Sequence, residues 1–246
     1  MNRDEELLTI CNTFGSFGDN IVVGVDEAGR GCLAGPVVAG ACFVPENEPI
    51  HPLIKDSKKM TEKQRMEAFE YLTLNSNIKC YASFIEPYEI DDINILNATM
   101  KAMGNVINES GANLALVDGD KTPKMFVDTS EIQTFIKGDS RMYSISCASV
   151  IAKVSRDLYM EELSKTYPEY GFANHMGYGT QAHMAAIEKM DQFHLCIGIH
   201  MLQLKSLHNE EWFVVIPSNF KQIEDIFTAI ATITKIFTSI STLLWK

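Results

Sequence analysis

Three apolar segments of the chain end in carboxylates, and these acids are the residues best suited to do chemistry. Asp26 and Glu27 follow IVVGV, Asp118 closes LALVD, and Asp139 follows IQTFIKG. Strand ends in α/β sheets bring side chains from distant parts of a sequence together, so these acids can meet at one place. Clustered carboxylates oppose one another's ionisation unless a cation is present. The pattern therefore predicts a metal site.

The ligand type indicates which cation such a site would take. Oxygen ligands alone suit hard ions such as Mg²⁺ and Mn²⁺, whereas zinc prefers a set of Cys and His that these acids do not offer. Two such ions, typically about 4 Å apart, can hold a phosphodiester, activate a water and stabilise the leaving oxygen. The chemistry that the acids predict is phosphoryl hydrolysis.

A structural role is the alternative for each acid. A single acid after a strand more often closes a turn or caps a helix, and this applies to Asp118 and Asp139 taken singly. Turn chemistry does not call for two acids, Asp26 and Glu27, followed by Gly-Arg-Gly at 29–31. Because adjacent strand residues point to opposite faces, we expect the strand to end or bulge where this pair shares a site.

The composition is that of a globular chain rather than a disordered one, since 46% of the 246 residues are hydrophobic and 22% are charged. A net charge of −11 argues against a protein that coats nucleic acid non-specifically, because such proteins usually have a strongly basic surface. This overall charge is compatible with local basic patches. Two clusters of basic residues stand out: Lys55, Lys58, Lys59, Lys63 and Arg65, and Lys137, Arg141, Lys153 and Arg156.

The cysteines and the N-terminal segment indicate the compartment. The six cysteines include no CxxC pair, and several lie in apolar runs where a thiol behaves as a small hydrophobe. The first residues, MNRDEELLTICNTF, carry acids and no long apolar run, unlike a signal peptide. We therefore expect a cytoplasmic protein.

Strands and helices alternate along the chain in a way that would position the acids. Strands are predicted at 21–26, 36–44, 79–87, 114–120 and 132–139, and helices at 62–74, 93–107, 144–167 and 181–190, with Thr61 as a helix cap. A loop rich in glycine and aromatic residues spans 170–180. This order favours a mixed sheet flanked by helices over a purely parallel one.

The C-terminal segment has a different pattern. From Ile223, apolar residues recur every three or four positions, and the opposite face carries Thr, Ser and Lys235. This polarity disfavours a membrane span and favours a helix that packs on the domain or on a partner. We divide the chain into an N-terminal extension (1–20), a catalytic domain (21–208) and a C-terminal extension with an amphipathic helix (209–246).

Six motifs, in this order, resemble ribonuclease HII, the type 2 ribonuclease H family. They are VDEAGRGCLAGPVV, DSKKMTEKQR, NILNATMKAM, LVDGD, IKGDSRMYSISCASVIAKVSRD and YGFANHMGYGT, and they span about residues 20 to 190. The resemblance implies an α/β fold with a ribonuclease H-like mixed sheet flanked by helices and additional C-terminal helices. It also implies that Asp26, Glu27, Asp118 and Asp139 are the catalytic, metal-binding acids.

The resemblance implies a specific reaction. Members of this family hydrolyse the RNA strand of RNA/DNA hybrids and cut 5′ of ribonucleotides embedded in duplex DNA, leaving 3′-hydroxyl and 5′-phosphate ends. Two ions, Mg²⁺ or Mn²⁺, would serve catalysis. Such hybrids and ribonucleotide-containing duplexes would be the partners of a protein that we expect to be monomeric, not membrane-bound, and active in ribonucleotide removal.

The resemblance also assigns substrate contacts. Gly29, Arg30 and Gly31 would approach the ribose, because glycines let main-chain groups come close to a 2′-hydroxyl and a phosphate. Tyr178 would sense the ribose. Ser57, Lys58 and Lys59 would contact the backbone phosphates. Lys153 and Arg156 lie on the helix after Asp139; by charge alone all these residues would form a solvated face, but beside the acids they would form a local basic track for the duplex on an acidic protein.

Two departures from the family pattern and two alternatives accompany this interpretation. The loop that usually reads HKGYGT has Met176 in place of the lysine, so one backbone contact would be missing, and residues 195–246 lack an obvious counterpart. The first alternative is a nucleic-acid-binding relative that keeps the fold but has impaired catalysis. The second is a different nuclease of the same fold.

Overall fold

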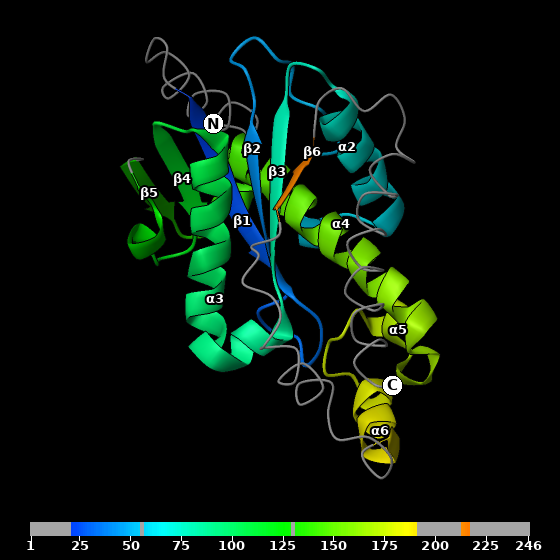
Figure 1. The fold of residues 1–246 in the computed structure, drawn as a ribbon. Helices are drawn as coiled ribbons and strands as arrows, with labels where there is room; N and C mark the ends of the chain where they lie inside the picture. The colour runs from blue at the N-terminus through cyan, green and yellow to red at the C-terminus, as the bar shows by residue number, and fades with distance from the viewer. Residues whose placement is uncertain (1–20, 55–56, 129–130, 191–212, 217–246) are drawn as a thin grey trace.

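A mixed β-sheet forms the centre of the fold (Figure 1). The computed structural model describes residues 21–54, 57–128, 131–190 and 213–216. Within these residues the sheet has six strands in the order β5-β4-β1-β2-β3-β6. They are β1 (Val22–Ala28), β2 (Val37–Phe43), β3 (Lys79–Ile85), β4 (Leu114–Asp118), β5 (Glu131–Phe135) and β6 (Phe213–Ile216). β1, β4 and β5 are parallel and the other neighbours are antiparallel, which confirms the predicted mixed sheet.

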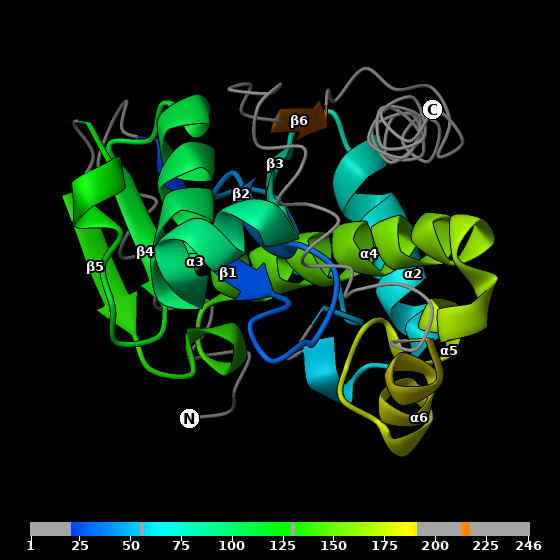
Figure 2. The ribbon, with the colours of Figure 1, turned by 60° about the horizontal axis from the view of Figure 1, so that its bottom comes forward.

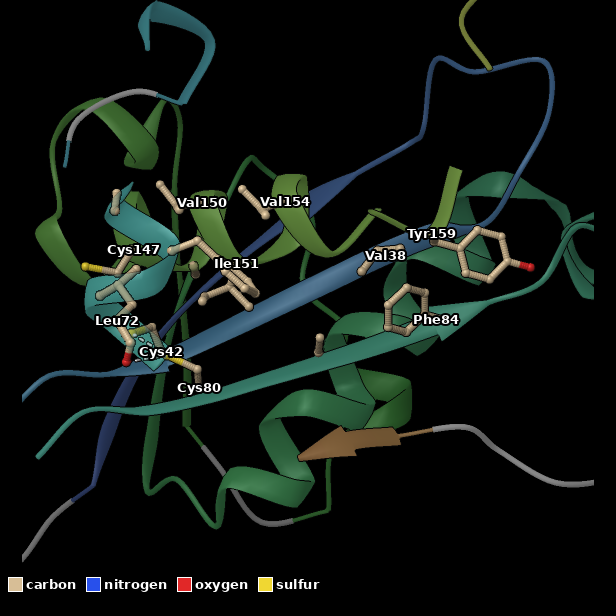
Figure 3. Close-up of a cluster of buried hydrophobic side chains, with 14 of the residues drawn as sticks. Val38, Cys42, Leu72, Cys80, Phe84, Cys147, Val150, Ile151, Val154 and Tyr159 are labelled. Carbon is tan, nitrogen blue, oxygen red and sulfur yellow. Dashed lines mark hydrogen bonds between the residues drawn. The ribbon is translucent and has the colours of Figure 1, made fainter. Parts of the chain in front are cut away.

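Helices cover both faces of the sheet (Figure 2). They are α2 (Glu62–Leu74), α3 (Pro87–Ser110), α4 (Tyr143–Thr166), α5 (Phe172–His175) and α6 (Gln181–Met190). α3 packs with Val25 of β1 and its neighbours, whereas α2 and α4 pack with Val38 of β2 and Phe84 of β3 (Figure 3). Because side chains alternate along a strand, the sheet separates two hydrophobic clusters.

Two glycines let α4 lie directly against the central strands. A β-carbon at Gly24 of β1 would stand 2.2 Å from the carbonyl carbon of Ser144, and one at Gly40 of β2 would stand 2.5 Å from the carbonyl oxygen of Ala148. Both distances are far shorter than van der Waals contact. Only glycine allows a helix and a sheet to approach this closely, so these positions set the depth at which α4 sits.

The predicted helix starts are correct in one case and displaced in another. Thr61 caps α2 as predicted: its Oγ1 accepts from the Gln64 N–H at 3.2 Å, and its own N–H donates to Gln64 Oε1 at 3.0 Å. α3 begins at Pro87, six residues before the predicted start at 93. Proline is favoured in the first turn of a helix, which explains the start at Pro87. A kink at Asn94, where φ is 67°, separates this first part from the regularly spaced apolar residues on which the predicted start was based.

The segment around Asp139 differs from the prediction. The strand predicted at 132–139 ends at Phe135 as β5, and Asp139 lies in a short 3₁₀ helix, η3 (Gly138–Ser140). Lys137 precedes it with a left-handed backbone, φ 56°, which turns the chain away from the sheet. Asp139 therefore reaches the end of the sheet through a turn rather than as a strand residue.

One strand lies within the segment assigned to the C-terminal extension. β6 pairs antiparallel with β3, from Cys80 opposite Ile216 to Ser83 opposite Phe213. The predicted helix from Ile223 and the N-terminal extension lie outside the described residues. Among the helices that the structure describes, none is long and apolar enough to cross a membrane.

Comparing two truncated chains tests the contribution of β6. A chain ending at residue 212 lacks β6, whereas a chain ending at residue 216 keeps it. Each backbone hydrogen bond contributes a net stabilisation of about 1 kcal/mol. At this chain length, a loss of 1 kcal/mol lowers Tm by about 2–4 °C. The shorter chain should therefore have a Tm at least ~4 °C lower. Calorimetry measures both values, and equal Tm values would show that β6 does not stabilise the sheet.

A buried acid lies where α3 meets α4. Glu86, the N-cap of α3, is 3% exposed, and the Tyr159 hydroxyl donates to its Oε2 at 3.0 Å. Its Oε1 has no hydrogen-bond partner among the described residues. Burial, supported by the charge of Glu89, raises the pKa of Glu86 to about 7 from an ordinary 4.5.

The raised pKa of Glu86 predicts a loss of stability with rising pH. Between about 4.5 and about 7 the folded protein holds this proton more tightly than the unfolded chain, so the free energy of unfolding falls as pH rises. The glutamine of the Glu86→Gln variant cannot ionise. As pH rises across this range, the free energy of unfolding of the variant should therefore increase by about 3 kcal/mol relative to that of the wild type. Urea unfolding of both proteins at several pH values measures the difference, and parallel pH profiles would contradict the assignment.

Candidate active site

Asp26 and Asp118 come together at the end of two parallel strands. The pairing of β1 with β4 ends at Val25 opposite Val117, so the two acids are the next residues in register. Asp26 is 5% exposed. Burial, followed by the charges of Glu27 and Asp118, raises the pKa of Asp26 well above its ordinary value. These two carboxylates therefore repel each other in a poorly solvated place, an arrangement that a bound cation relieves.

Glu27 takes a different direction from its neighbour. β1 pairs with β2 in unbroken register from Gly24 to Ala28, so the strand has no bulge at this point, and alternation sends Asp26 and Glu27 to opposite faces. The expected bulge is therefore absent. The pairing of β1 with β4 ends before Asp26, as expected for a strand end, but the pairing of β1 with β2 continues past it. The Glu27 N–H donates to Asp26 Oδ1 at 2.8 Å, and Arg30 Nη1 donates to Glu27 Oε1 at 3.2 Å.

Asp139 is held at the same end of the sheet by its neighbours. The Gly138 N–H donates to Asp118 Oδ1 at 2.6 Å, and the Ser146 hydroxyl of α4 donates to the Asp139 carbonyl at 2.5 Å. A β-carbon at Gly138 would stand 2.6 Å from Ile145 Cδ1, so a larger residue there would displace the end of the Ile145 side chain. Asp139 itself is 5% exposed. η3 is thus fixed between β4 and α4, and Asp139 directly follows the residue that bonds the Asp118 carboxylate.

The donor set fits a hard divalent cation, although the four acids do not form a complete metal site. Among the described residues, no group of three or more His, Cys, Asp or Glu side chains is arranged to hold a metal ion. Asp26 and Asp118 are the pair that the structure brings together, with Asp139 beside them and Glu27 bonded to Arg30. Paired carboxylates of this kind are the ligands that Mg²⁺ and Mn²⁺ take.

The Gly-Arg-Gly segment lies next to these acids. Gly29 has φ +106°, and a β-carbon there would stand 2.5 Å from Arg156 Nε and 2.6 Å from the Pro36 carbonyl, so the position requires glycine. A β-carbon added at Gly31 would meet no atom within 4 Å, which leaves open space over the backbone. The Arg30 side chain is about half exposed. Within this segment, the main chain at Gly31 is therefore the part with open space beside it.

Tyr178 lies beside this segment although about 145 residues separate them. Cys32 and Tyr178 form a β-bridge, the Leu33 N–H donates to the Gly177 carbonyl at 2.9 Å, and the Cys32 thiol hydrogen-bonds the Tyr178 side chain. The Tyr178 ring is 40% exposed, and Lys153 Nζ lies 5.5 Å from its centre. The structure thus joins the two segments that the sequence predicted to sense the ribose.

Arg156 corrects one expectation from the sequence. We predicted this residue as part of an exposed basic track, but its side chain is fully buried. Its Nε donates to the Pro36 carbonyl at 2.9 Å, Nη2 to Ala34 at 2.9 Å and Nη1 to Met176 at 2.7 Å. All three guanidinium nitrogens donate to carbonyls within the protein, so Arg156 binds two loops together rather than a phosphate.

The remaining predicted contacts lie in varied settings. Lys153 is partly exposed and forms an ion pair with Asp157 at 2.6 Å. Ser57, in the short helix η1 (Ser57–Lys59), is 4% exposed, and its hydroxyl bonds the Ser149 hydroxyl at 2.7 Å. The Lys58 side chain lies outside the described part of the chain, whereas Lys59 is exposed. Met176, which replaces the family lysine, packs against the hydrophobic cluster under α4.

Sequence reasoning missed two buried histidines that support the Tyr178 loop. The rings of His175 and His183 stack with centroids 4.4 Å apart. The Gly177 N–H donates to His175 Nδ1 at 3.3 Å, and His183 Nδ1 lies 2.9 Å from the Tyr178 carbonyl, which makes it the donor. Burial, the largest cause, lowers the pKa of His183 and so favours the neutral form of this ring. The signal in the sequence was a histidine on each side of GYG.

Comparison with known proteins identifies the family. The model of the ribonuclease HII family matches residues 23–210. Ribonuclease HII of Vibrio parahaemolyticus is 45% identical over 174 residues, covering 70% of this chain and 80% of the relative. Ribonuclease HII of Caldicellulosiruptor bescii is 42% identical over 191 residues, covering 77% and 90%.

Solved structures share the fold. The ribonuclease H2 of Pyrococcus horikoshii is 30% identical with a TM-score of 0.59, covering 72% of this chain and 90% of that one. Bst-RNase HIII, solved in complex with Mn²⁺, matches the fold at 15% identity with a TM-score of 0.59, covering 76% and 66%. From these matches, the chain belongs to the ribonuclease HII family and is a ribonuclease H enzyme.

Proposed function

We propose that this endoribonuclease hydrolyses the RNA strand of RNA/DNA hybrids and cuts 5′ of ribonucleotides embedded in duplex DNA, leaving 3′-hydroxyl and 5′-phosphate ends. The observation that carries the proposal is the meeting of Asp26 and Asp118 at one sheet end. The Gly29–Gly31 segment and Tyr178 lie together in the same part of the fold. Acids for cleavage and groups for ribose recognition are thus combined in one protein.

The acids are proposed to hold two divalent cations, Mg²⁺ or Mn²⁺. Asp26 and Asp118 would form the central ligand pair, with Asp139 beside them and Glu27 contributing its carboxylate or its carbonyl. Bound there, the ions would supply an activated water and offset the charge on the leaving oxygen. The Mn²⁺ complex of Bst-RNase HIII, which shares the fold, supports a divalent ion.

Ribose recognition is proposed for the loops that Arg156 binds together. Open space over Gly31 would let main-chain groups approach a 2′-hydroxyl and its phosphate. The half-exposed ring of Tyr178 would lie on the sugar, held in place by Cys32 and by the bridge between the two segments. Lys153, next to this ring, would attract the adjacent phosphates.

The remaining proposals concern the setting of the enzyme. We propose residues 21–208 as the catalytic domain, to whose sheet the C-terminal extension adds β6, together with monomeric action and a cytoplasmic location. The cysteines that the structure describes, Cys32, Cys42, Cys80 and Cys147, are free thiols, which supports a reducing compartment.

Replacing one acid tests the catalytic site. Asp139→Asn should slow cutting of a DNA duplex with a single ribonucleotide by more than about 100-fold, since even residues that only support a metal ligand reach that value. Binding to the hybrid should remain. The measurement is cleavage with Mg²⁺ or with Mn²⁺ together with a filter-binding assay. Asp120→Asn is the matched control, because Asp120 follows β4 but is 69% exposed.

The same assay separates the alternatives. A wild-type protein that binds hybrids but cuts nothing with either ion would favour a non-catalytic relative. Equal cutting of an all-DNA duplex would favour a different nuclease of this fold.

Changing His183 tests the support of Tyr178. His183→Ala removes the donor to the Tyr178 carbonyl and should raise KM for the single-ribonucleotide duplex about tenfold, the value of one hydrogen bond of about 1–1.5 kcal/mol. His183→Asn, whose amide nitrogen can replace Nδ1, should retain most of the affinity. Steady-state kinetics of both variants provide the measurement. An equal rise in KM for both, at unchanged Tm, would rule out this supporting role.

A further inference from the structure

Two buried serines connect the η1 segment to the acid site. Ser57 of η1 and Ser149 of α4 are each 4% exposed, and their hydroxyl oxygens lie 2.7 Å apart. Asp26 pairs with Gly40, and Gly40 lies directly against Ala148 and Ala152 of α4. Ser149 lies in this turn of the helix, and its side chain hydrogen-bonds the Asp26 carboxylate. The three side chains form a continuous chain from the surface segment that carries Lys58 and Lys59 to the buried acid.

The direction of each hydrogen bond follows from the groups involved. A carboxylate that binds a cation is ionised and can only accept, so in that state the Ser149 hydroxyl donates to Asp26. Ser149 has then used its single proton, and it must accept the bond from the Ser57 hydroxyl. The order of donation is Ser57 to Ser149 to Asp26.

The position of Ser149 on α4 sets it apart from a serine that only satisfies its own helix. Ser146, one turn earlier, shares its single proton between the Asp139 carbonyl at 2.5 Å and the Met142 carbonyl of its own helix at 3.2 Å. Ser149 instead bonds groups from η1 and β1, which lie outside its helix. α4 thus presents one hydroxyl to the main chain of Asp139 and the next to the carboxylate of Asp26.

We propose that Ser57 and Ser149 are positioning residues that hold the Asp26 carboxylate in the orientation in which it binds metal. This role rests on the proposed function of Asp26 as a metal ligand. Partners that hydrogen-bond a metal ligand fix its direction and contribute to metal affinity. Ser57 therefore acts through its buried hydroxyl on the acid, and phosphate contact is left to the lysines that follow it.

Metal binding by the substrate-free full-length chain tests the proposal. Titration with Mn²⁺, followed by electron paramagnetic resonance, gives a Kd that does not depend on cutting. Ser149→Ala should weaken Mn²⁺ binding by about 10- to 100-fold, the usual effect of losing such a partner. Ser57→Ala should weaken it less, because Ser149 keeps its proton for Asp26. Ser149→Thr retains the hydroxyl and should retain the affinity.

The double variant is the decisive comparison. If the two hydroxyls act in series, Ser57→Ala should add nothing to the loss caused by Ser149→Ala. Ser155→Ala is the matched control, because Ser155 is a fully buried serine of the same helix whose hydroxyl has no hydrogen-bond partner among the described residues. Thermal unfolding of each variant detects a general loss of structure.

The outcomes separate this role from the function on which it rests. Wild-type protein that binds Mn²⁺ and cuts, together with a Ser149→Ala variant that binds Mn²⁺ equally tightly, would overturn the positioning role alone. Additive losses in the double variant would overturn the serial arrangement. Wild-type protein that neither binds Mn²⁺ nor cuts would overturn the proposed function, and this role with it.

Discussion

The close contact between α4 and the glycines of the central strands is the constraint on which the site depends. With Gly24 and Gly40 beneath it, the helix lies at backbone contact with β1 and β2. At that depth its hydroxyls reach the acids, and its Arg156 reaches the carbonyls of the loops. A side chain at either glycine would push the helix outward. Its hydroxyls would then move away from the acids, and Arg156 would move away from the loop carbonyls. The residues proposed for catalysis and for recognition therefore share one structural support.

The sequence predicted the acids better than their surroundings. Asp26 and Asp118 follow apolar runs that end in charge, and the parallel register of β1 and β4 brings them together as expected. Asp139 also lies at this end of the sheet, but a left-handed residue and a 3₁₀ turn place it there. Such a turn leaves little trace in hydrophobic periodicity, which reports regular elements only.

Polar residues whose partners are distant in sequence were the hardest to interpret. In the sequence, Arg156 cannot be distinguished from an exposed arginine that binds phosphate. Only the fold shows that three carbonyls surround it. Ser57 lies in a basic segment, yet its hydroxyl faces inward toward a residue 92 positions away. The four residues of β6 form an apolar run too short to distinguish strand from helix by pattern.

The bonds of Arg156 have a consequence for how the protein reaches its folded state. Its partners Pro36 and Ala34 are 120 and 122 residues away, while Met176 is 20 residues away. Both long-range bonds close nearly the same loop, so most of the chain entropy for closing it is lost once for the two, and the shorter loop to Met176 costs less to close. The surface that would recognise a ribose therefore depends on contacts between distant parts of the chain, and it cannot form in a fragment that lacks either half.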